Sequence, residues 1–260
     1  MPKVERIRLY PFKGFGGAEV EEARVSEAGT LEHDREFALH DGDSTINGKD
    51  TDAVHGFTTR LDTTSDELTV ESPDGGTVTV EMSYEGAREL TDWLGDDDRF
   101  GDATVKRDVP FGFVDRRDRL PSVSVVSTAT LREVASWFDG IDTDDVRRRL
   151  RTNVEVSGVP AFWEDRFVGE DAPDFRVGDV RFEGAEPCAR CVVPTRDPDT
   201  GETTEGFRET FVRRRRETLG DDAADDVFDH AYTVTLIARV AEDDRGSVVR
   251  VGDSVEVVNG

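Results

Sequence analysis

Apolar and polar residues alternate along most of the first ninety residues of the chain. The alternation is clearest in VERIRLYPF, AEVEEARV, REFALHD, ELTVES and GTVTVEM, at 4–12, 18–25, 35–41, 67–72 and 76–82. A two-residue period is typical of strands with one buried face, and the Gly, Asp and Pro residues between these segments favour turns. Short strands at such regular spacing predict an antiparallel sheet or a small β-barrel.

Other stretches carry the three-to-four-residue apolar period of an amphipathic helix. YEGARELTDWLG (84–95) predicts one helix that ends at Gly95. SVSVVSTATLREVASWFDG (122–140) predicts a strand running into a helix, with Ser127 or Thr128 as the N-cap. A helix at 144–150, a strand at 151–158 and a helix at 207–220 follow.

The order of these elements predicts the fold class and the organisation of the chain. Strands do not alternate regularly with helices, so a doubly wound parallel sheet is not expected. The segment 96–120 has little periodicity and carries Pro, Gly and charge, although 103–106 is compatible with a short strand. We therefore expect a β-dominated α+β protein, with a β-barrel-like domain at 1–95, a connection at 96–120 and a second β domain with a few helices at 121–260.

Acidic residues are spread along the whole chain, where 58 Asp and Glu against 33 Lys and Arg give a net charge of −25. Lysine occurs only at positions 3, 13, 49 and 106. Self-repulsion at this charge density destabilises a compact chain, and molar salt screens it by shortening the Debye length to about 3 Å. The composition resembles that of halophilic proteins from a high-salt cytoplasm. An acidic mimic of nucleic acid is the alternative, but it would concentrate the carboxylates on one element. Binding to a phosphate backbone is disfavoured by the charge and the salt, so no nucleic acid partner is expected.

The N-terminal sequence and the cysteine content bear on localisation. MPKVERIRLYPFKGFGG lacks the apolar core and cleavage site of a signal peptide. The chain has no run of 18 apolar residues and only two cysteines, too few for a secreted disulfide scaffold. We expect a cytoplasmic location and no membrane partner.

Both cysteines, Cys188 and Cys191, stand in EPCARCVVPTRDPDTG (186–201). A disulfide, a metal ligand pair, a redox switch and a single reactive thiolate all fit this spacing. Structural zinc takes four ligands, but the chain has no second pair at zinc-finger spacing and only four scattered histidines. An iron–sulfur cluster usually takes four cysteines. Both of these metal sites are disfavoured.

Three interpretations of the cysteine pair remain. A thioredoxin-like dithiol usually opens a helix, whereas VVPTRD places two β-branched residues and a proline after the motif. Two small cysteines buried in a strand form the purely structural alternative. In the third interpretation one thiolate is a soft metal ligand, and the charge of Arg190 would favour the thiolate of Cys191 if the two side chains are close. The spacing alone does not decide among them.

Taken together, several stretches resemble the MOSC superfamily, named after the C-terminal domain of molybdenum cofactor sulfurase. They are most similar to its two-part proteins with an N-terminal β-barrel domain, such as the mitochondrial amidoxime-reducing component. The matching stretches are RLYPFKGFGG (8–17), HDREFAL (33–39), RTNVEVSG (151–158), FWEDRF (162–167), VGDVRFEGAEPCARCVVPTRDPDTG (177–201) and VRVGDSVEVV (249–258). They occur in family order and cover nearly the whole chain.

The resemblance implies molybdopterin bound between the two regions. By position in the motif it implies Cys191 as the molybdenum ligand and catalytic residue, with Cys188 as a neighbour. It also implies phosphate and pterin contacts from Lys13, Arg35, Arg151 and Asn153. The residue types agree, because arginine forks and a lysine ammonium suit a phosphate and an amide suits the polar atoms of a pterin.

The sequence departs from the family pattern in two places. Gly14 replaces the serine that often follows the lysine, although a glycine lets the backbone approach a phosphate closely. The stretch RRDRLPSVSVVS (116–127) does not match cleanly, and Ser127 is placed near the cofactor. Arg190, beside Cys191, is also assigned to the cofactor site. We expect DPDTG (197–201) to be a turn without chemistry and Arg213–Arg216 to be a solvated helix face.

The activity implied is that of a molybdenum-cofactor oxidoreductase that reduces N-hydroxylated or N-oxygenated small molecules. The chain lacks the cysteines of an iron–sulfur domain, so the electrons are expected from a separate ferredoxin-like or flavoprotein-like donor. Two alternatives stay open. The chain would be a non-catalytic MOSC module that carries or transfers sulfur or the cofactor, or a dithiol oxidoreductase that uses Cys188 and Cys191.

Overall fold

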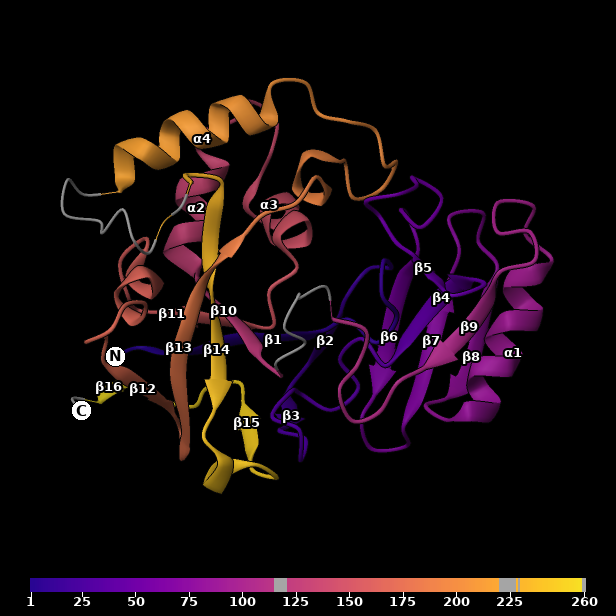
Figure 1. Ribbon diagram of the computed structural model, residues 1–260, viewed down its shortest axis with the longest axis horizontal. Helices are drawn as coiled ribbons and strands as arrows, with labels where there is room; N and C mark the ends of the chain where they lie inside the picture. Colours follow the sequence, from indigo (N-terminus) through magenta and orange to yellow (C-terminus); the bar gives the residue numbers. More distant parts are fainter. Residues whose placement is uncertain (115–120, 220–227, 229, 259–260) are drawn as a thin grey trace.

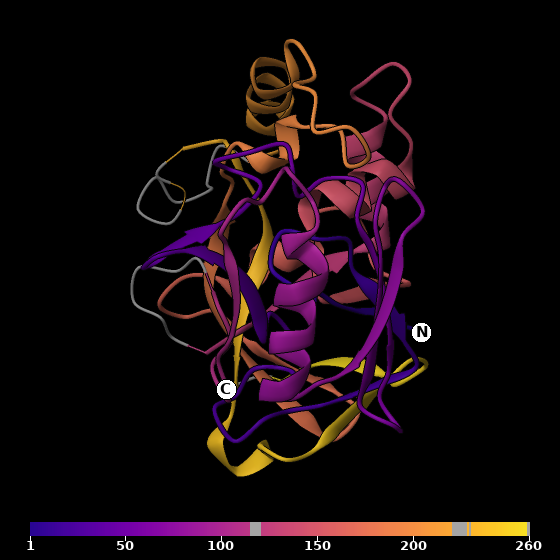
Figure 2. The same cartoon turned by 90° about the vertical axis from the view of Figure 1, so that its right-hand side faces the viewer.

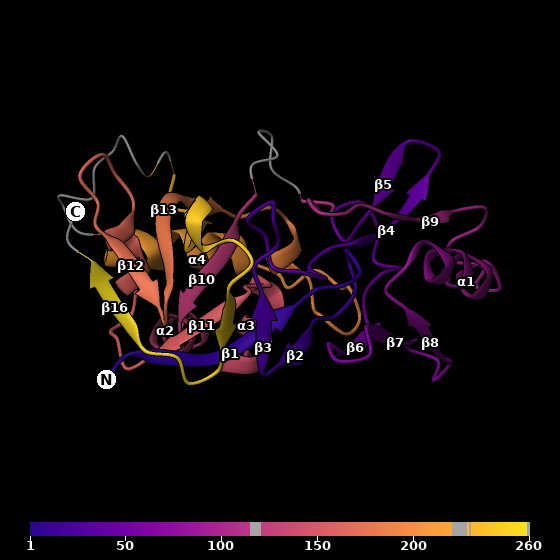
Figure 3. The ribbon, with the colours of Figure 1, turned by 90° about the horizontal axis from the view of Figure 1, so that it is seen from below.

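The computed structural model describes residues 1–114, 121–219, 228 and 230–258 (Figure 1). In these residues four α-helices accompany sheets of eight, two, three and three strands. The expected β-dominated α+β class is confirmed. Figures 1 and 3 show the large sheet at one end of an elongated molecule and the two three-stranded sheets at the other end.

The eight-stranded sheet has the order β16-β12-β13-β14-β10-β11-β1-β2. Neighbouring strands are antiparallel except for β10 and β11, which are parallel and are joined through two helices. Such a crossover is needed because a parallel partner must begin at the same end of the sheet. The bounds are β1 Lys3–Leu9, β2 Ala18–Val20, β10 Val123–Ser127, β11 Val154–Ser157, β12 Asp174–Val177, β13 Val180–Ala189, β14 Thr233–Val240 and β16 Val255–Val258.

Three helices pack beside the large sheet: α2 (Thr128–Ala135), α3 (Thr143–Leu150) and α4 (Phe207–Thr218). They share an apolar cluster that includes Trp137 and Phe211. Arg215 of α4 is fully buried and forms an ion pair with Asp165 at 2.6 Å. The expectation of a solvated face for the whole run 213–216 was therefore wrong at Arg215, because the helix turns that position toward the sheet.

The other end of the molecule holds two small antiparallel sheets and α1 (Tyr84–Gly95), which faces the viewer in Figure 2. One sheet has the order β5-β4-β9 and the other β6-β7-β8. Stacked rings of Phe12, Phe15 and Phe57, with centroids 4.1 and 4.3 Å apart, lie in the core of this end. The bounds are β4 Phe37–Asp41, β5 Ser44–Ile46, β6 Thr58–Asp62, β7 Glu67–Glu71, β8 Thr77–Glu81 and β9 Thr104–Arg107.

Several strand pairings join segments that the sequence analysis assigned to different domains. β1 and β2 belong to the first ninety-five residues. β1 nevertheless pairs with β11, and β2 extends the same sheet. β9 lies in the predicted connection and pairs with β4. A two-stranded sheet joins β3 (Glu22–Arg24) to β15 (Val248–Arg250). The division at residues 95 and 121 stays a prediction.

No helix among the described residues is long and apolar enough to cross a membrane.

Candidate functional site

A cavity of about 380 Å³ lies where the two ends of the molecule meet. Its walls come from the loop after β1, the segment before β6, the C-terminal end of α3 and the segment that follows β13. Most of the site residues predicted from the sequence line it: Lys13, Gly14, Arg35, Arg151, Asn153, Arg190 and Cys191, together with Cys188. The structure thus brings together residues that are far apart in the sequence.

The lining is strongly cationic in a strongly acidic chain. Its cations are Arg8, Lys13, Arg35, Lys49, Arg148, Arg149, Arg151, Arg190 and Arg196. Among the described residues that line the cavity there is no Asp or Glu, although the chain contains 58 of them. Four of these cations are ion-paired with described carboxylates outside the lining: Arg8 with Glu19, Arg35 with Asp34, Arg148 with Asp199 and Arg149 with Asp197. The positive charge that remains favours anions in the cavity.

The loop after β1 brings backbone close to the cavity. Gly14 has φ +95°, a left-handed conformation that favours glycine. A Cβ at Gly16 would lie 2.8 Å from the carbonyl oxygen of Phe57, and one at Gly17 would lie 2.6 Å from the ring of Tyr10. The glycines are therefore required by close packing, and Lys13 donates from Nζ to the carbonyl oxygen of Phe113 at 2.9 Å.

Arg35 and Arg151 occupy unusual backbone positions. Both are left-handed, with φ +59° and +53°, and Arg151 forms the C-cap of α3. Non-glycine residues are uncommon in this region, and such strain tends to gather at functional sites. Nη2 of Arg35 donates to the carbonyl oxygen of Arg151 at 3.3 Å, so the two residues are in direct contact.

The cysteine pair lies at the end of β13. Cys188 is half-buried in the strand, Cys191 is exposed beyond it, and the two are not bonded to each other. Nη1 of Arg190 lies 3.0 Å from Sγ of Cys188, and Nη2 donates to the carbonyl oxygen of Leu150 at 2.6 Å. The guanidinium therefore contacts Cys188, whereas the sequence places its charge next to Cys191. Residues two apart on an extended chain share a side, which explains the difference.

A short 3₁₀ turn, η2 (Val193–Thr195), follows the cysteines. A thioredoxin-like dithiol would sit at the start of an α-helix, which η2 does not provide. Within the described part of the chain, no group of three or more His, Cys, Asp and Glu side chains is suited to hold a metal.

Two residues assigned from the sequence have structural roles. Oδ1 of Asn153 accepts hydrogen bonds from Oγ and N of Ser124 at 2.8 and 3.2 Å, and its Nδ2 donates to the carbonyl oxygen of Arg8 at 3.2 Å. Ser127 is fully buried, caps α2 by accepting from Thr130 N at 2.9 Å, and does not line the cavity. Its short hydroxyl suits the N-cap, and that role turns it away from the site.

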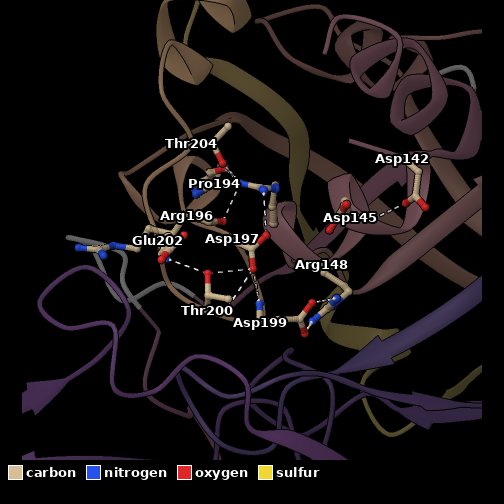
Figure 4. A network of polar contacts seen from close by, with 11 residues as sticks. Asp142, Asp145, Arg148, Pro194, Arg196, Asp197, Asp199, Thr200, Glu202 and Thr204 are labelled. Atoms are coloured by element: carbon tan, nitrogen blue, oxygen red, sulfur yellow. Dashed lines mark hydrogen bonds and ion pairs between the residues drawn. The ribbon is translucent and has the colours of Figure 1, made fainter. Parts of the chain in front are cut away.

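Arg148 and Arg149, which are neighbours in α3, hold the DPDTG loop (197–201) against that helix (Figure 4). Arg148 forms a bidentate ion pair with Asp199. Burial acts to raise the pKa of Asp197, but N–H groups of Thr200 and Asp199 outweigh it and hold the pKa below its ordinary value. The loop also accepts a hydrogen bond from Gly56 N at 3.2 Å, so it joins the two ends of the molecule beside the cavity.

Some residues at the site were missed by the sequence analysis. Lys49 and His55 line the cavity from the segment before β6. Burial, with the charges of Arg196 and Arg151, lowers the pKa of His55, so its ring is neutral at pH 7. Tyr232 does not line the cavity, but its carbonyl oxygen accepts a hydrogen bond from Arg190 N at 2.9 Å, and burial raises the pKa of its hydroxyl to about 12. The scarcity of lysine, which drew attention to Lys13, also applied to Lys49.

Comparisons with known proteins show the family to which the chain is similar. Residues 1–141 match the MOSC N-terminal beta barrel domain, and residues 120–256 match the MOSC domain. Molybdenum cofactor sulfurase of Caenorhabditis briggsae is 24% identical over 227 residues, covering 78% of this chain and 30% of that protein, so the chain spans about a third of its relative's length. The crystal structure of the YUAD protein from Bacillus subtilis is 13% identical, covers 99% of this chain and 96% of its own, and has a TM-score of 0.39.

The two family matches together span residues 1–256, and the chain therefore belongs to the MOSC family, with an N-terminal MOSC β-barrel domain followed by a MOSC domain.

Proposed function

We propose that the chain is a molybdenum-cofactor oxidoreductase that reduces N-hydroxylated or N-oxygenated small molecules. The observation that carries the proposal is the cavity lined by nine cations, no described Asp or Glu, and the exposed thiol of Cys191. A phosphorylated pterin is an anion, and a thiolate is the type of soft ligand that a molybdenum ion can take from a protein. The donor set therefore fits the group.

Residues of this chain would hold the cofactor in two places. Lys13, Arg35 and Arg151 supply an ammonium and two guanidinium groups for a phosphate, and the close-packed glycine loop next to Lys13 lets backbone approach it. Cys191 would supply the metal ligand, and its exposure leaves the sulfur accessible. Asn153 would act indirectly, by joining the segments of Ser124 and Arg8 that line the cavity, because its side-chain amide is already bonded to both residues.

When bound, the cofactor would supply two-electron redox chemistry at nitrogen–oxygen bonds. In the overall reaction the N–O bond of the substrate breaks, two electrons and two protons are taken up, and the oxygen leaves as water. The electrons would come from a separate ferredoxin-like or flavoprotein-like donor. The cationic lining would disfavour positively charged molecules in the cavity. The acidic composition suits a protein that functions in a high-salt cytoplasm.

A second candidate is a non-catalytic module that carries or transfers sulfur or the cofactor. The similarity of the chain to a stretch of a protein named molybdenum cofactor sulfurase favours it. An exposed cysteine beside an anion-binding cavity suits that role as well. The dithiol alternative has less support, because η2 gives no helix N-terminus to the cysteines.

The test is molybdenum and pterin analysis of protein purified at high salt from a host that makes the cofactor. Wild type is compared with Cys191→Ala and Cys188→Ala. We expect about one molybdenum per chain in wild type and Cys188→Ala, and loss of the metal in Cys191→Ala. Wild-type protein that contains neither molybdenum nor pterin would contradict the proposal.

Activity separates the oxidoreductase from the carrier. Loaded protein is supplied with a chemical reductant and assayed with amidoximes and N-hydroxylated bases. Reduction supports the oxidoreductase, whereas cofactor binding without reduction supports the carrier. Equal dependence of activity on both thiols would favour the dithiol mechanism.

A further inference from the structure

Tyr10 lies directly after β1 and contacts both left-handed arginines of the cavity. The guanidinium carbon of Arg151 is 4.2 Å from the centre of the Tyr10 ring, and that of Arg35 is 5.2 Å from it. Both distances are within the range of a cation–π interaction. The side chain of Tyr10 is 1% exposed and lines the cavity.

The two arginines reach this ring from distant parts of the chain. They are 116 residues apart, Arg35 before β4 and Arg151 at the C-cap of α3. The Arg35 guanidinium also forms an ion pair with Asp34, and Nη1 of Arg151 donates to the carbonyl oxygen of Phe15 at 2.6 Å. Two guanidinium groups that contact one ring repel each other, and each backbone is held in a conformation that L-residues seldom adopt. The electron-rich ring and the Asp34 carboxylate offset part of this repulsion. The arrangement places two guanidinium groups against one ring at the cavity wall.

Neighbouring residues hold both the backbone and the ring of Tyr10. Tyr10 N donates to Oδ1 of Asp34 at 2.9 Å, and Arg35 N donates to the carbonyl oxygen of Tyr10 at 2.8 Å. A Cβ at Gly17 would lie only 2.6 Å from Cε1 of Tyr10, so the ring packs tightly against glycine backbone. Such packing leaves the ring little freedom to rotate away from the arginines.

The environment of the Tyr10 hydroxyl differs from that of the ring. It is buried without a hydrogen-bond partner among the described residues, and burial raises its pKa, so it stays protonated. The contacts that Tyr10 makes with the arginines are therefore contacts of the ring face. Phenylalanine at this position would preserve them, whereas an aliphatic side chain would not.

We propose that Tyr10 is a positioning residue whose ring holds Arg35 and Arg151 together as a two-arginine site for a phosphate group. Guanidinium groups recognise phosphate through paired N–H bonds, which require both groups to be oriented in advance. The identity of the phosphate as that of the cofactor rests on the proposed function. The positioning of the two arginines does not.

The test measures binding of inorganic phosphate by calorimetry, in fixed high salt, for wild type, Tyr10→Phe and Tyr10→Leu. We expect roughly tenfold weaker binding in Tyr10→Leu, the size of a desolvated cation–π contact, and a change of less than about twofold in Tyr10→Phe. Arg216→Leu removes an exposed arginine of α4 outside the cavity and should leave phosphate binding unchanged. Circular dichroism checks folding, and Tyr10→Met replaces Tyr10→Leu if that variant does not fold.

A double variant addresses the mechanism. If Tyr10 acts through Arg151, then Tyr10→Leu weakens binding much less in an Arg151→Gln background than in wild type. Unchanged phosphate binding in Tyr10→Leu overturns the proposal, as does equal weakening in Tyr10→Phe and Tyr10→Leu, or full additivity with Arg151→Gln.

The outcomes also separate this inference from the proposed function. Phosphate binding that depends on the Tyr10 ring, in protein that never acquires pterin or molybdenum, would support the positioning role and reject the cofactor. Protein that carries normal pterin in wild type and in Tyr10→Leu alike, with unchanged phosphate binding, would reject the positioning role alone.

Discussion

Nη1 of Arg149 donates a hydrogen bond of 2.7 Å to the carbonyl oxygen of Arg196. The same nitrogen lies 3.1 Å from the carbonyl oxygen of Pro194 and 3.1 Å from Oγ1 of Thr204. Arg149 is 4% exposed, so one buried guanidinium of α3 holds both ends of the loop that follows Cys191. The DPDTG motif, expected to be a turn without chemistry, is thereby fixed relative to the cysteine segment.

Removing this guanidinium should destabilise the protein strongly. Arg149→Met leaves three acceptors near the cavity without their donor, and we expect a loss of about 3 kcal/mol in the free energy of unfolding. Denaturant titration in high salt measures it. Arg148→Met is the matched control, because it breaks a more exposed ion pair with Asp199 and should lose no more than about 1 kcal/mol. Equal losses in the two variants would argue against the anchoring role.

Glu164 predicts a specific dependence of stability on pH. It is 1% exposed in η1 (Trp163–Phe167), and burial, followed by the charge of Asp165, raises its pKa from 4.5 to about 7. The fold thus favours the neutral carboxyl. The stability that this carboxyl contributes is complete below pH 4.5 and is lost as the pH rises through 7.

The measurement compares Glu164→Gln with wild type from pH 5 to 8.5. The variant stays neutral at position 164. Its free energy of unfolding minus that of wild type should therefore increase as the pH rises, by up to about 3 kcal/mol. Glu5→Gln, exposed on β1, controls for the removal of one charge from an acidic chain. A difference between Glu164→Gln and wild type that does not change with pH would contradict the prediction.

Asn153 is predicted to matter for stability more than for direct contact with a ligand. Asn153→Ala removes the acceptor for Ser124 and the donor to the carbonyl oxygen of Arg8, at a residue only 3% exposed. We expect a loss of about 2 kcal/mol by thermal or denaturant unfolding. Ser124→Ala removes one partner and should lose about half as much. A fully stable Asn153→Ala with poor pterin retention would instead make its amide a ligand contact.

Gly17 tests how tightly the cavity wall is built. A Cβ there would lie 2.6 Å from Cε1 of Tyr10 and 2.8 Å from Cγ of Arg8, so Gly17→Ala should cost about 1–3 kcal/mol of stability. The same variant should weaken phosphate binding by displacing the Tyr10 ring. Gly95→Ala is the control, because a Cβ there meets nothing within 4 Å. Phosphate binding as strong as in wild type would contradict this prediction, because displacing the ring would then leave phosphate binding by the arginines unchanged.

Elements with a strong local signal were predicted well from the sequence. The apolar period of 84–95 is confirmed as α1, and the alternating segment 67–72 is confirmed as β7. β5 and β6 were missed because Ser44–Ile46 is only three residues long and TTRLD at Thr58–Asp62 is largely polar. These strands form by pairing with β4 and β7, and this pairing leaves no periodic pattern in the short segments themselves.

The sequence by itself determined the β-dominated class, most of the helices and the residue types of the site, because these follow from local periodicity and from motifs a few residues long. Only the tertiary structure decided which atoms meet. Arg190 contacts Cys188, Ser127 lies outside the cavity lining, and Tyr10 contacts two arginines that are 116 residues apart. Such contacts depend on strand pairing and chain crossings over long distances, so a local sequence pattern carries no record of them.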